Sequence, residues 1–216
     1  MTVASENELR RYTDILSVMD MLRHERITLL SPEKWHDRND RHTMEIYAQQ
    51  RDIPSVLAYC MTEAPETAHH WQVFAGHSFG ACVVFKKAEF LEHIRKRPEL
   101  RCESVEYWTL ERLERDGPVP IDRLPFIKRS AFQDEREVRL IADEAAMFEG
   151  STLSVSIRIG LINRVIFSPF AVRALVDTAK DVMLGFEGCG SLPFMASALM
   201  DNKKWRRETE KSRVAL

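Results

Sequence analysis

The amino-acid sequence predicts an α+β domain, in which a mixed, mostly antiparallel twisted sheet, or one split into two small sheets, is flanked by helices. Strand-like and helix-like segments do not alternate regularly, which argues against a doubly wound parallel sheet. Several expected strands are separated only by short turns, as in antiparallel sheets. The 216 residues are 44% hydrophobic and contain no repeats and no long Gly/Ser linker. We therefore expect residues 1–216 to form a single domain.

The N-terminal segment predicts a strand, a helix and a second strand in succession. Residues 9–13 have strand character, and residues 14–24 place apolar side chains at helical spacing behind an N-cap at Thr13 or Asp14. The stretch "RITLLSP" is typical of a strand, and Pro32 is expected to end it.

The next segment predicts a loop, a helix and two strands. The polar stretch "WHDRND", residues 35–40, is expected to be a loop before a helix over residues 41–50. β-branched and aromatic residues predict strands at residues 55–62 and 80–86. The stretch between these strands, residues 63–79, is expected to form a short helix or a lid.

In the second half of the chain we expect a helix at residues 87–97 and a strand near "CESVEYWT", residues 102–109. Prolines make regular structure improbable in "DGPVPIDRLPFIKR", residues 116–129. Residues 171–186 carry the clearest helical pattern. Further strands are expected at residues 137–143, 152–158, 164–168 and 191–197.

The tail of the sequence is basic. Its stretch "NKKWRRETEKSR" carries six basic residues against two acidic ones, and residues 203–216 are expected to fray. The whole chain is nearly balanced, with 31 Lys and Arg, 33 Asp and Glu and a formal net charge of −2. No overall field therefore drives it onto nucleic acid or an anionic membrane.

The sequence predicts a cytoplasmic protein without a membrane partner. No apolar run approaches the roughly 18 residues that span a bilayer, and the start of the chain has no apolar segment typical of a signal peptide. The four cysteines form no C-x-x-C pair, which argues against a disulfide framework and a zinc knuckle.

The stretch "SAFQDEREVRL", residues 130–140, places charged residues at every second position. In an extended strand Glu135, Glu137 and Arg139 would share one face, and Val138 and Leu140 would share the other. One face is therefore expected to be buried and the other to carry chemistry. The alternative is an exposed polar face, on which Arg139 forms surface salt bridges of little weight.

Several motifs together resemble a bacterial family filed as domain-of-unknown-function 2971. These are "LRRYTDILSVMDMLRHERITLLSPEKWHDRND", "LAYCMTEAPETAHHWQVFAGHSFGACVVF", "LPFIKR", "FQDEREVRLI" and "RVIFSPF", and they cover roughly residues 9–205. That family has no assigned activity, so this resemblance implies an architecture rather than a reaction.

The layout also resembles the ADP-ribosyltransferase superfamily, through "RRYT" on a first strand, "GHSFG" in the middle and "DEREVRL" late in the chain. The resemblance implies NAD as a substrate and no metal. It implies that Glu137 stabilises the oxocarbenium-like state at the ribose, and that Glu135 orients or deprotonates the acceptor. Arg11 or Arg10 would hold the pyrophosphate.

The same resemblance implies further contacts to the dinucleotide. Tyr12 or Trp71 would stack on the nicotinamide. Apart from the resemblance, the stretch "ETAHHW" offers His69 or His70 as an acid, a base or a ligand. Ser78 lies in a glycine-flanked loop whose amides could approach a phosphate, although the same glycines are typical of an ordinary turn. The hypothesis requires Arg11, Tyr12 and the two glutamates to meet in one cleft.

A second pattern leaves a rival function open. "WHDRNDRH" gathers oxygen and imidazole groups that could hold a divalent cation in a phosphodiesterase or nuclease, namely His36, Asp37, Asn39, Asp40 and His42. The structural alternative is a loop whose Asp and Asn side chains cap the following helix. A third hypothesis is a non-catalytic module that binds a small anionic ligand, a nucleotide or a partner protein.

The leading interpretation is an ADP-ribosyltransferase-like enzyme. It would use NAD on a macromolecular acceptor, either protein or nucleic acid, in bacterial defence against phage or in stress.

Overall fold

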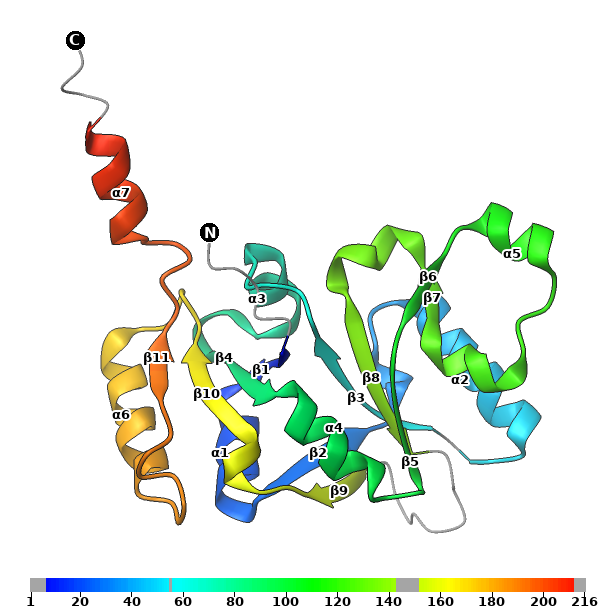
Figure 1. The fold of residues 1–216 in the computed structure, drawn as a ribbon, viewed down its shortest axis with the longest axis horizontal. Helices are drawn as coiled ribbons and strands as arrows, with labels where there is room; N and C mark the ends of the chain where they lie inside the picture. The colour runs from blue at the N-terminus through cyan, green and yellow to red at the C-terminus, as the bar shows by residue number, and fades with distance from the viewer. Residues whose placement is uncertain (1–6, 55, 143–151, 212–216) are drawn as a thin grey trace.

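The computed structural model describes residues 7–54, 56–142 and 152–211 (Figure 1). It confirms the predicted α+β class. Within these ranges nine strands form one mixed, mainly antiparallel sheet, and two short strands form a separate parallel sheet.

The strands are β1 (Glu8–Asp14), β2 (Arg26–Leu30), β3 (Leu57–Thr62), β4 (Gly80–Lys86), β5 (Leu100–Ser104), β6 (Glu106–Trp108), β7 (Ile127–Arg129), β8 (Glu137–Ala142), β9 (Thr152–Ser156), β10 (Ile162–Phe167) and β11 (Phe194–Ala196). The α-helices are α1 (Ile15–His24), α2 (Arg38–Arg51), α3 (Ala68–Phe74), α4 (Lys87–Arg95), α5 (Leu110–Asp116), α6 (Arg173–Leu184) and α7 (Lys203–Glu210). Short 3-10 turns are η1 (Pro32–Lys34), η2 (His77–Phe79), η3 (Ile121–Phe126), η4 (Ser130–Glu135) and η6 (Ile159–Leu161).

The helix starts follow from side-chain caps. The carboxylate of Asp14 accepts a hydrogen bond from the amide of Ser17 at 2.8 Å and begins α1, as one of the two expected caps. The carboxylate of Asp37 accepts from the amide of Asn39 at 2.9 Å. Because of this cap, α2 begins at Arg38, so the expectation that residues 35–40 are all loop is wrong for their second half.

Three other expectations need correction. The single strand expected at residues 102–109 is two strands, since β5 pairs with β8 whereas β6 pairs with β7. Residues 116–129 are not irregular throughout, because η3 and β7 lie within them. The sequence did not indicate α5, a short exposed helix that the hydroxyl of Thr109 caps.

The main sheet divides at β3. Its continuous path runs β11-β10-β4-β1-β3-β2-β9, and β8 and β5 branch from β3. β3 pairs with β8 along its whole length, but it meets β1 only at Arg10↔Thr62 and β2 only at Leu30↔Ala58. The strands are therefore parted on each side of these contacts, and β1 and β3 enclose a split in the sheet.

Main-chain groups face this split. Alternate residues of an antiparallel strand turn their N–H and C=O groups to opposite neighbours. The main-chain N–H and C=O groups of Arg10 point toward β3. Those of Tyr12, two residues further on, point in the same direction, but there β3 no longer pairs with β1, so they face the split. On β3 the carbonyl of Cys60 faces the split, where it accepts a hydrogen bond from the Arg11 side chain at 2.8 Å.

The two faces of the sheet are covered differently. One face carries the largest core, to which α1, α4 and α6 contribute side chains such as Val18, Phe90 and Met183. The other face carries two smaller cores. Trp71 of α3 packs over β1, β4 and β10, whereas Tyr47 of α2 and Phe126 of η3 pack over β3 and β8. The split between β1 and β3 lies between these two small cores.

The basic tail forms a helix in the described part of the chain. Lys203–Glu210 make α7, with every side chain exposed, and Figure 1 shows α7 projecting away from the sheet. Residues 212–216 lie outside the described ranges, and fraying of the tail stays a prediction. Among the described residues, no helix has the length and apolar character needed to cross a bilayer.

Candidate active site

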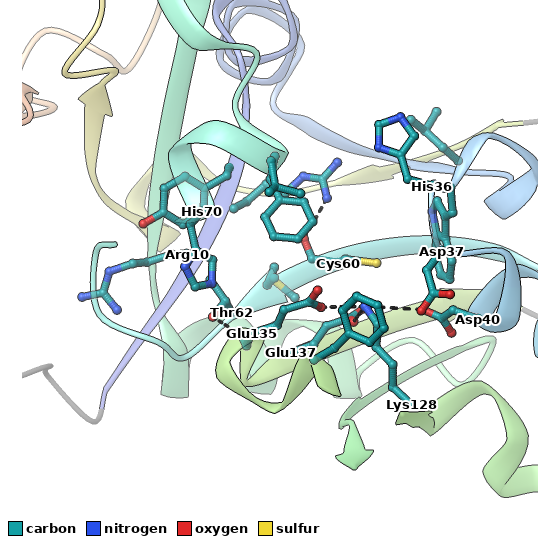
Figure 2. A pocket seen from close by; sticks show the side chains of 18 of the residues that line it. Arg10, His36, Asp37, Asp40, Cys60, Thr62, His70, Lys128, Glu135 and Glu137 are labelled. Carbon is teal, nitrogen blue, oxygen red and sulfur yellow. Dashed lines mark hydrogen bonds and ion pairs between the residues drawn. The ribbon is translucent and has the colours of Figure 1, made fainter. Parts of the chain in front are cut away.

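A pocket of about 710 Å³ opens at the split between β1 and β3 (Figure 2). This volume lies within the range of roughly 300–1,000 Å³ that is typical of ligand sites. The first strand contributes Arg10, Arg11 and Tyr12, and β3 contributes Cys60, Met61 and Thr62. The remaining walls come from α3, the segment leading into α2, and the segment from β7 to β8.

Glu137, at the start of β8, is the most firmly held carboxylate of the pocket. Its Oε1 accepts from Arg139 Nε at 2.8 Å and its Oε2 from Arg139 Nη2 at 3.0 Å. Lys128 Nζ donates to the same Oε2 at 3.2 Å. The main-chain amide of Glu137 donates to the hydroxyl of Tyr107 at 2.8 Å. Glu137 is thus fixed in position by three neighbouring side chains.

Arg139 connects Glu137 to α2. Its guanidinium is fully buried and also donates to both carboxylate oxygens of Asp40, at 3.1 and 2.8 Å, and to the carbonyl of Pro125 at 2.7 Å. Trp35 lies 4.8 Å from the guanidinium. The alternative of an exposed, polar strand face is therefore wrong, since every residue of β8 is buried and its ion pairs are interior ones.

Glu135 reaches the same place by a different route. It belongs to η4 rather than to the strand, because Arg136 adopts a left-handed conformation with φ 42° between Glu135 and Glu137. The predicted alternation along one strand is wrong at this residue. The two carboxylates nevertheless converge, since Lys128 Nζ lies 2.6 Å from Glu135 Oε2 and 3.2 Å from Glu137 Oε2 (Figure 2).

Burial and the neighbouring charges shift the pKa values of the three acids in different directions. Burial opposes ionisation of Glu137, but Arg139 and Lys128 outweigh it and lower the pKa of Glu137 to about 2. Burial raises the pKa of Asp40 despite Arg139, with the charge of Glu137 adding to the effect. Burial likewise raises the pKa of Glu135, although Lys128 opposes this. Glu137 is thus held ionised, and the raised pKa of Glu135 makes it the better proton acceptor of the two glutamates.

Arg11 and Arg10 differ in their partners. Arg10 is buried and donates to Glu8 at 2.6 Å and to the carbonyl of Ala64 at 3.1 Å. Arg11 donates to the carbonyl of Cys60, and its guanidinium lies 4.7 Å from the ring centroid of Tyr59. Among the described residues, no carboxylate pairs with Arg11. Of the two arginines offered by the sequence, Arg11 is therefore the one whose charge is available to an anion.

Tyr12 and His70 form a second wall of the pocket. Thr67 caps α3, and its hydroxyl lies 2.5 Å from His70 Nδ1. The His70 ring stacks on Tyr12 with centroids 5.2 Å apart. Burial lowers the pKa of His70, so the ring is neutral near pH 7. The Nε2 of His70 and the hydroxyl of Tyr12 are buried, and neither has a hydrogen-bond partner among the described residues.

Six of the residues selected from the sequence for binding or cleaving NAD line this one pocket: Arg10, Arg11, Tyr12, His70, Glu135 and Glu137. Two others do not. Trp71 is fully buried, packs edge-on against Tyr12 at 5.0 Å and donates to Glu66 at 2.8 Å, so it supports Tyr12 from behind. Ser78 is exposed in η2 and does not line the pocket.

The "WHDRNDRH" segment has a structural explanation. Asp37 caps α2, Asp40 binds Arg139, and His42 is exposed beside Glu45. Within the ranges that the structure describes, no three His, Cys, Asp or Glu side chains are grouped so that they could hold a metal ion. The capping alternative offered by the sequence is confirmed for Asp37.

Sequence reasoning did not assign Asp40, Lys128 or Arg139 to the same site as the two glutamates. For Lys128 a signal was present, since "LPFIKR" places it shortly before the acidic pair, where it could either meet an anionic substrate or neutralise the two glutamates. For Asp40 the sequence offered only the metal hypothesis, because its partner Arg139 lies 99 residues away.

Comparison with known proteins gave several solved structures. Thermus sp. 2.9 DarT in complex with ADP-ribosylated ssDNA has a TM-score of 0.46 and 8% identity, over 89% of this chain and 94% of its own. The same protein in complex with carba-NAD+ has a TM-score of 0.43 and 9% identity, over 93% and 98%. Its complex with NAD+ has a TM-score of 0.44 and 9% identity, over 89% and 96%.

No family model matches the chain, and no curated protein matches it. The resemblance to domain-of-unknown-function family 2971 therefore stays a prediction.

Proposed function

We propose that this protein is an ADP-ribosyltransferase-like enzyme that cleaves NAD and transfers ADP-ribose to a macromolecular acceptor. The observation that carries the proposal is the charge distribution of one pocket. Three carboxyl groups, of Asp40, Glu135 and Glu137, surround two cations there, and Arg11 lines the same pocket without a carboxylate partner among the described residues. A ligand with a positively charged ring and a negatively charged pyrophosphate complements both features.

The chemistry assigns a distinct task to Glu137. When the bond between the nicotinamide nitrogen and the ribose C1′ breaks, the electron pair leaves with the nicotinamide and positive charge develops on the ribose. A carboxylate that is already oriented stabilises that charge without reorganisation in the transition state. Glu137 meets this requirement, because Arg139 and Lys128 hold it ionised and in place.

Glu135 is suited to the acceptor. The nucleophile that attacks C1′ must lose a proton, and a carboxylate whose pKa is raised accepts that proton better than an ordinary carboxylate does. Burial raises the pKa of Glu135, and the residue lines the pocket beside Glu137. The two glutamates therefore have different tasks, since Glu137 stabilises the ribose cation and Glu135 deprotonates the acceptor.

The direct test is incubation of the purified protein with labelled NAD and bacterial cell extract. The proposal predicts release of nicotinamide and transfer of label to protein or nucleic acid, and nuclease and protease digestion of the product then identifies the acceptor class. Binding of NAD without release of nicotinamide would instead support a non-catalytic module. The absence of both NAD binding and nicotinamide release would overturn the proposal.

Arg11→Met is expected to weaken NAD binding about 10- to 100-fold, because a hydrogen-bonded charge contributes about 1.5–3 kcal/mol. The effect should appear in the KM for NAD, and in the Kd measured by calorimetry, more than in kcat. Arg26→Met is the matched control, since Arg26 pairs with Asp20 at 2.6 Å and does not line the pocket. Equal NAD affinity in the two variants would show that Arg11 does not hold the pyrophosphate.

A further inference from the structure

Lys128 is the cation of the pocket with the most acidic partners. Its Nζ lies 2.6 Å from Glu135, 3.2 Å from Glu137 and 3.6 Å from Asp40, and 8% of its side chain is exposed. These partners come from three elements, η4, β8 and α2. An ammonium group has three N–H donors and no acceptor. Two of these donors bind the carboxylates of Glu135 and Glu137, and the carboxylate of Asp40 lies near the third as an ion-pair partner, so little of the ammonium group is left for a phosphate.

The other groups around Lys128 are an aromatic ring, two neutral side chains and one further cation. The centroid of the Phe132 ring lies 5.0 Å from Nζ. Burial raises the pKa of Tyr107 on β6 to about 12, and burial also raises the pKa of Cys60 on β3, so both groups stay neutral. The other charged neighbour is Arg139, which binds the far side of Glu137 and Asp40.

We propose that Lys128 is a positioning residue that keeps Glu135 and Glu137 close together and correctly protonated, and that it does not bind the substrate. The inference rests on the proposed function. Two carboxylates near one cation repel each other once that cation is removed, and the pair then retains a proton to higher pH. Without Lys128, Arg139 alone would balance Asp40, Glu135 and Glu137, and Glu135 has no contact with it.

The test compares nicotinamide release across pH in wild type, Lys128→Met and Lys128→Arg. Lys128→Met should move the acidic limb of the rate profile upward by about one pH unit or more, so that activity lost at neutral pH returns at higher pH. Lys128→Arg should keep the limb near that of wild type, because it restores the charge. A raised KM for NAD with an unmoved acidic limb would overturn the inference and assign Lys128 to substrate binding.

A second measurement does not depend on turnover. Carboxyl-carbon NMR titration, with the signals assigned through Glu135→Gln and Glu137→Gln, should show both glutamates protonating at higher pH in Lys128→Met than in wild type. Unchanged titrations would overturn the inference even if NAD is consumed. Absence of nicotinamide release by the wild type would instead defeat the proposed function and leave this readout intact.

Two further variants complete the design. Lys96→Met is the control for loss of a lysine, since Lys96 is exposed at the C-terminal end of α4, does not line the pocket and pairs only weakly with Glu92 at 3.5 Å. If Lys128→Met fails to fold, Lys128→Gln takes its part, because it removes the charge and keeps a polar head group. The same shift of the acidic limb and of the carboxyl titrations is expected for it.

Discussion

Glu137→Gln is expected to lower the rate of nicotinamide release by about 10²-fold or more, with a much smaller change in NAD affinity. The amide keeps the shape of the side chain but removes the charge that stabilises the ribose cation, and loss of one such electrostatic contact costs about 10²–10³ in kcat. The pocket would still accept the dinucleotide, because Arg11 and the apolar walls are unchanged. Steady-state kinetics together with calorimetric NAD binding separate the two effects.

The control for this variant is Glu114→Gln, on the exposed helix α5, which should behave as wild type. Because the Glu137→Gln change leaves Arg139 with one anionic partner fewer, the melting temperature must be measured for each variant. A folded Glu137→Gln protein that releases nicotinamide at the wild-type rate would contradict the role assigned to Glu137.

Arg139→Met is expected to destabilise the fold by about 3–5 kcal/mol, the typical cost of removing one partner from a buried ion pair. The methionine can fill much of the space, but the carboxylates of Glu137 and Asp40 would stay buried with Lys128 as their remaining cation. Urea unfolding followed by circular dichroism measures the change. The site should lose activity as well, since α2 and β8 would no longer be joined through this guanidinium.

The matched control is Arg173→Met. The side chain of Arg173 is 94% exposed and lies 3.9 Å from Asp177, so its removal should change stability by less than about 1 kcal/mol. A similar loss of stability in both variants would mean that the buried ion pairs of Arg139 contribute no more to the free energy of unfolding than an exposed ion pair does. A loss confined to Arg139→Met supports its role as the tie between α2 and β8.

Much of the fold could be predicted because its strands carry strong local signals. β4 contains two adjacent valines and a phenylalanine, β8 contains valine, leucine and isoleucine, and both strands were expected within a residue of their observed bounds. Elements whose formation depends on a distant partner were missed. β7 has three residues and exists through its pairing with β6, a contact that composition does not encode.

The site was predictable in part for the same reason. The pairing of Glu135 and Glu137 is local, and Arg11 and Tyr12 stand on a clear strand. The burial of Glu137 could not be foreseen, because it depends on Asp40 and Lys128, which tertiary packing brings to Arg139 and to the two glutamates. Spacing alone favoured a solvated polar face, whereas a matched set of buried charges produces the same sequence pattern.

The parting of β1 from β3 has a consequence for how this pocket can change over evolutionary time. The peptide groups of Tyr12 and Cys60 that line the gap belong to the backbone, and no exchange of side chain deletes a peptide N–H except replacement by proline. Mutations can therefore alter the side-chain chemistry around the gap while these main-chain groups persist.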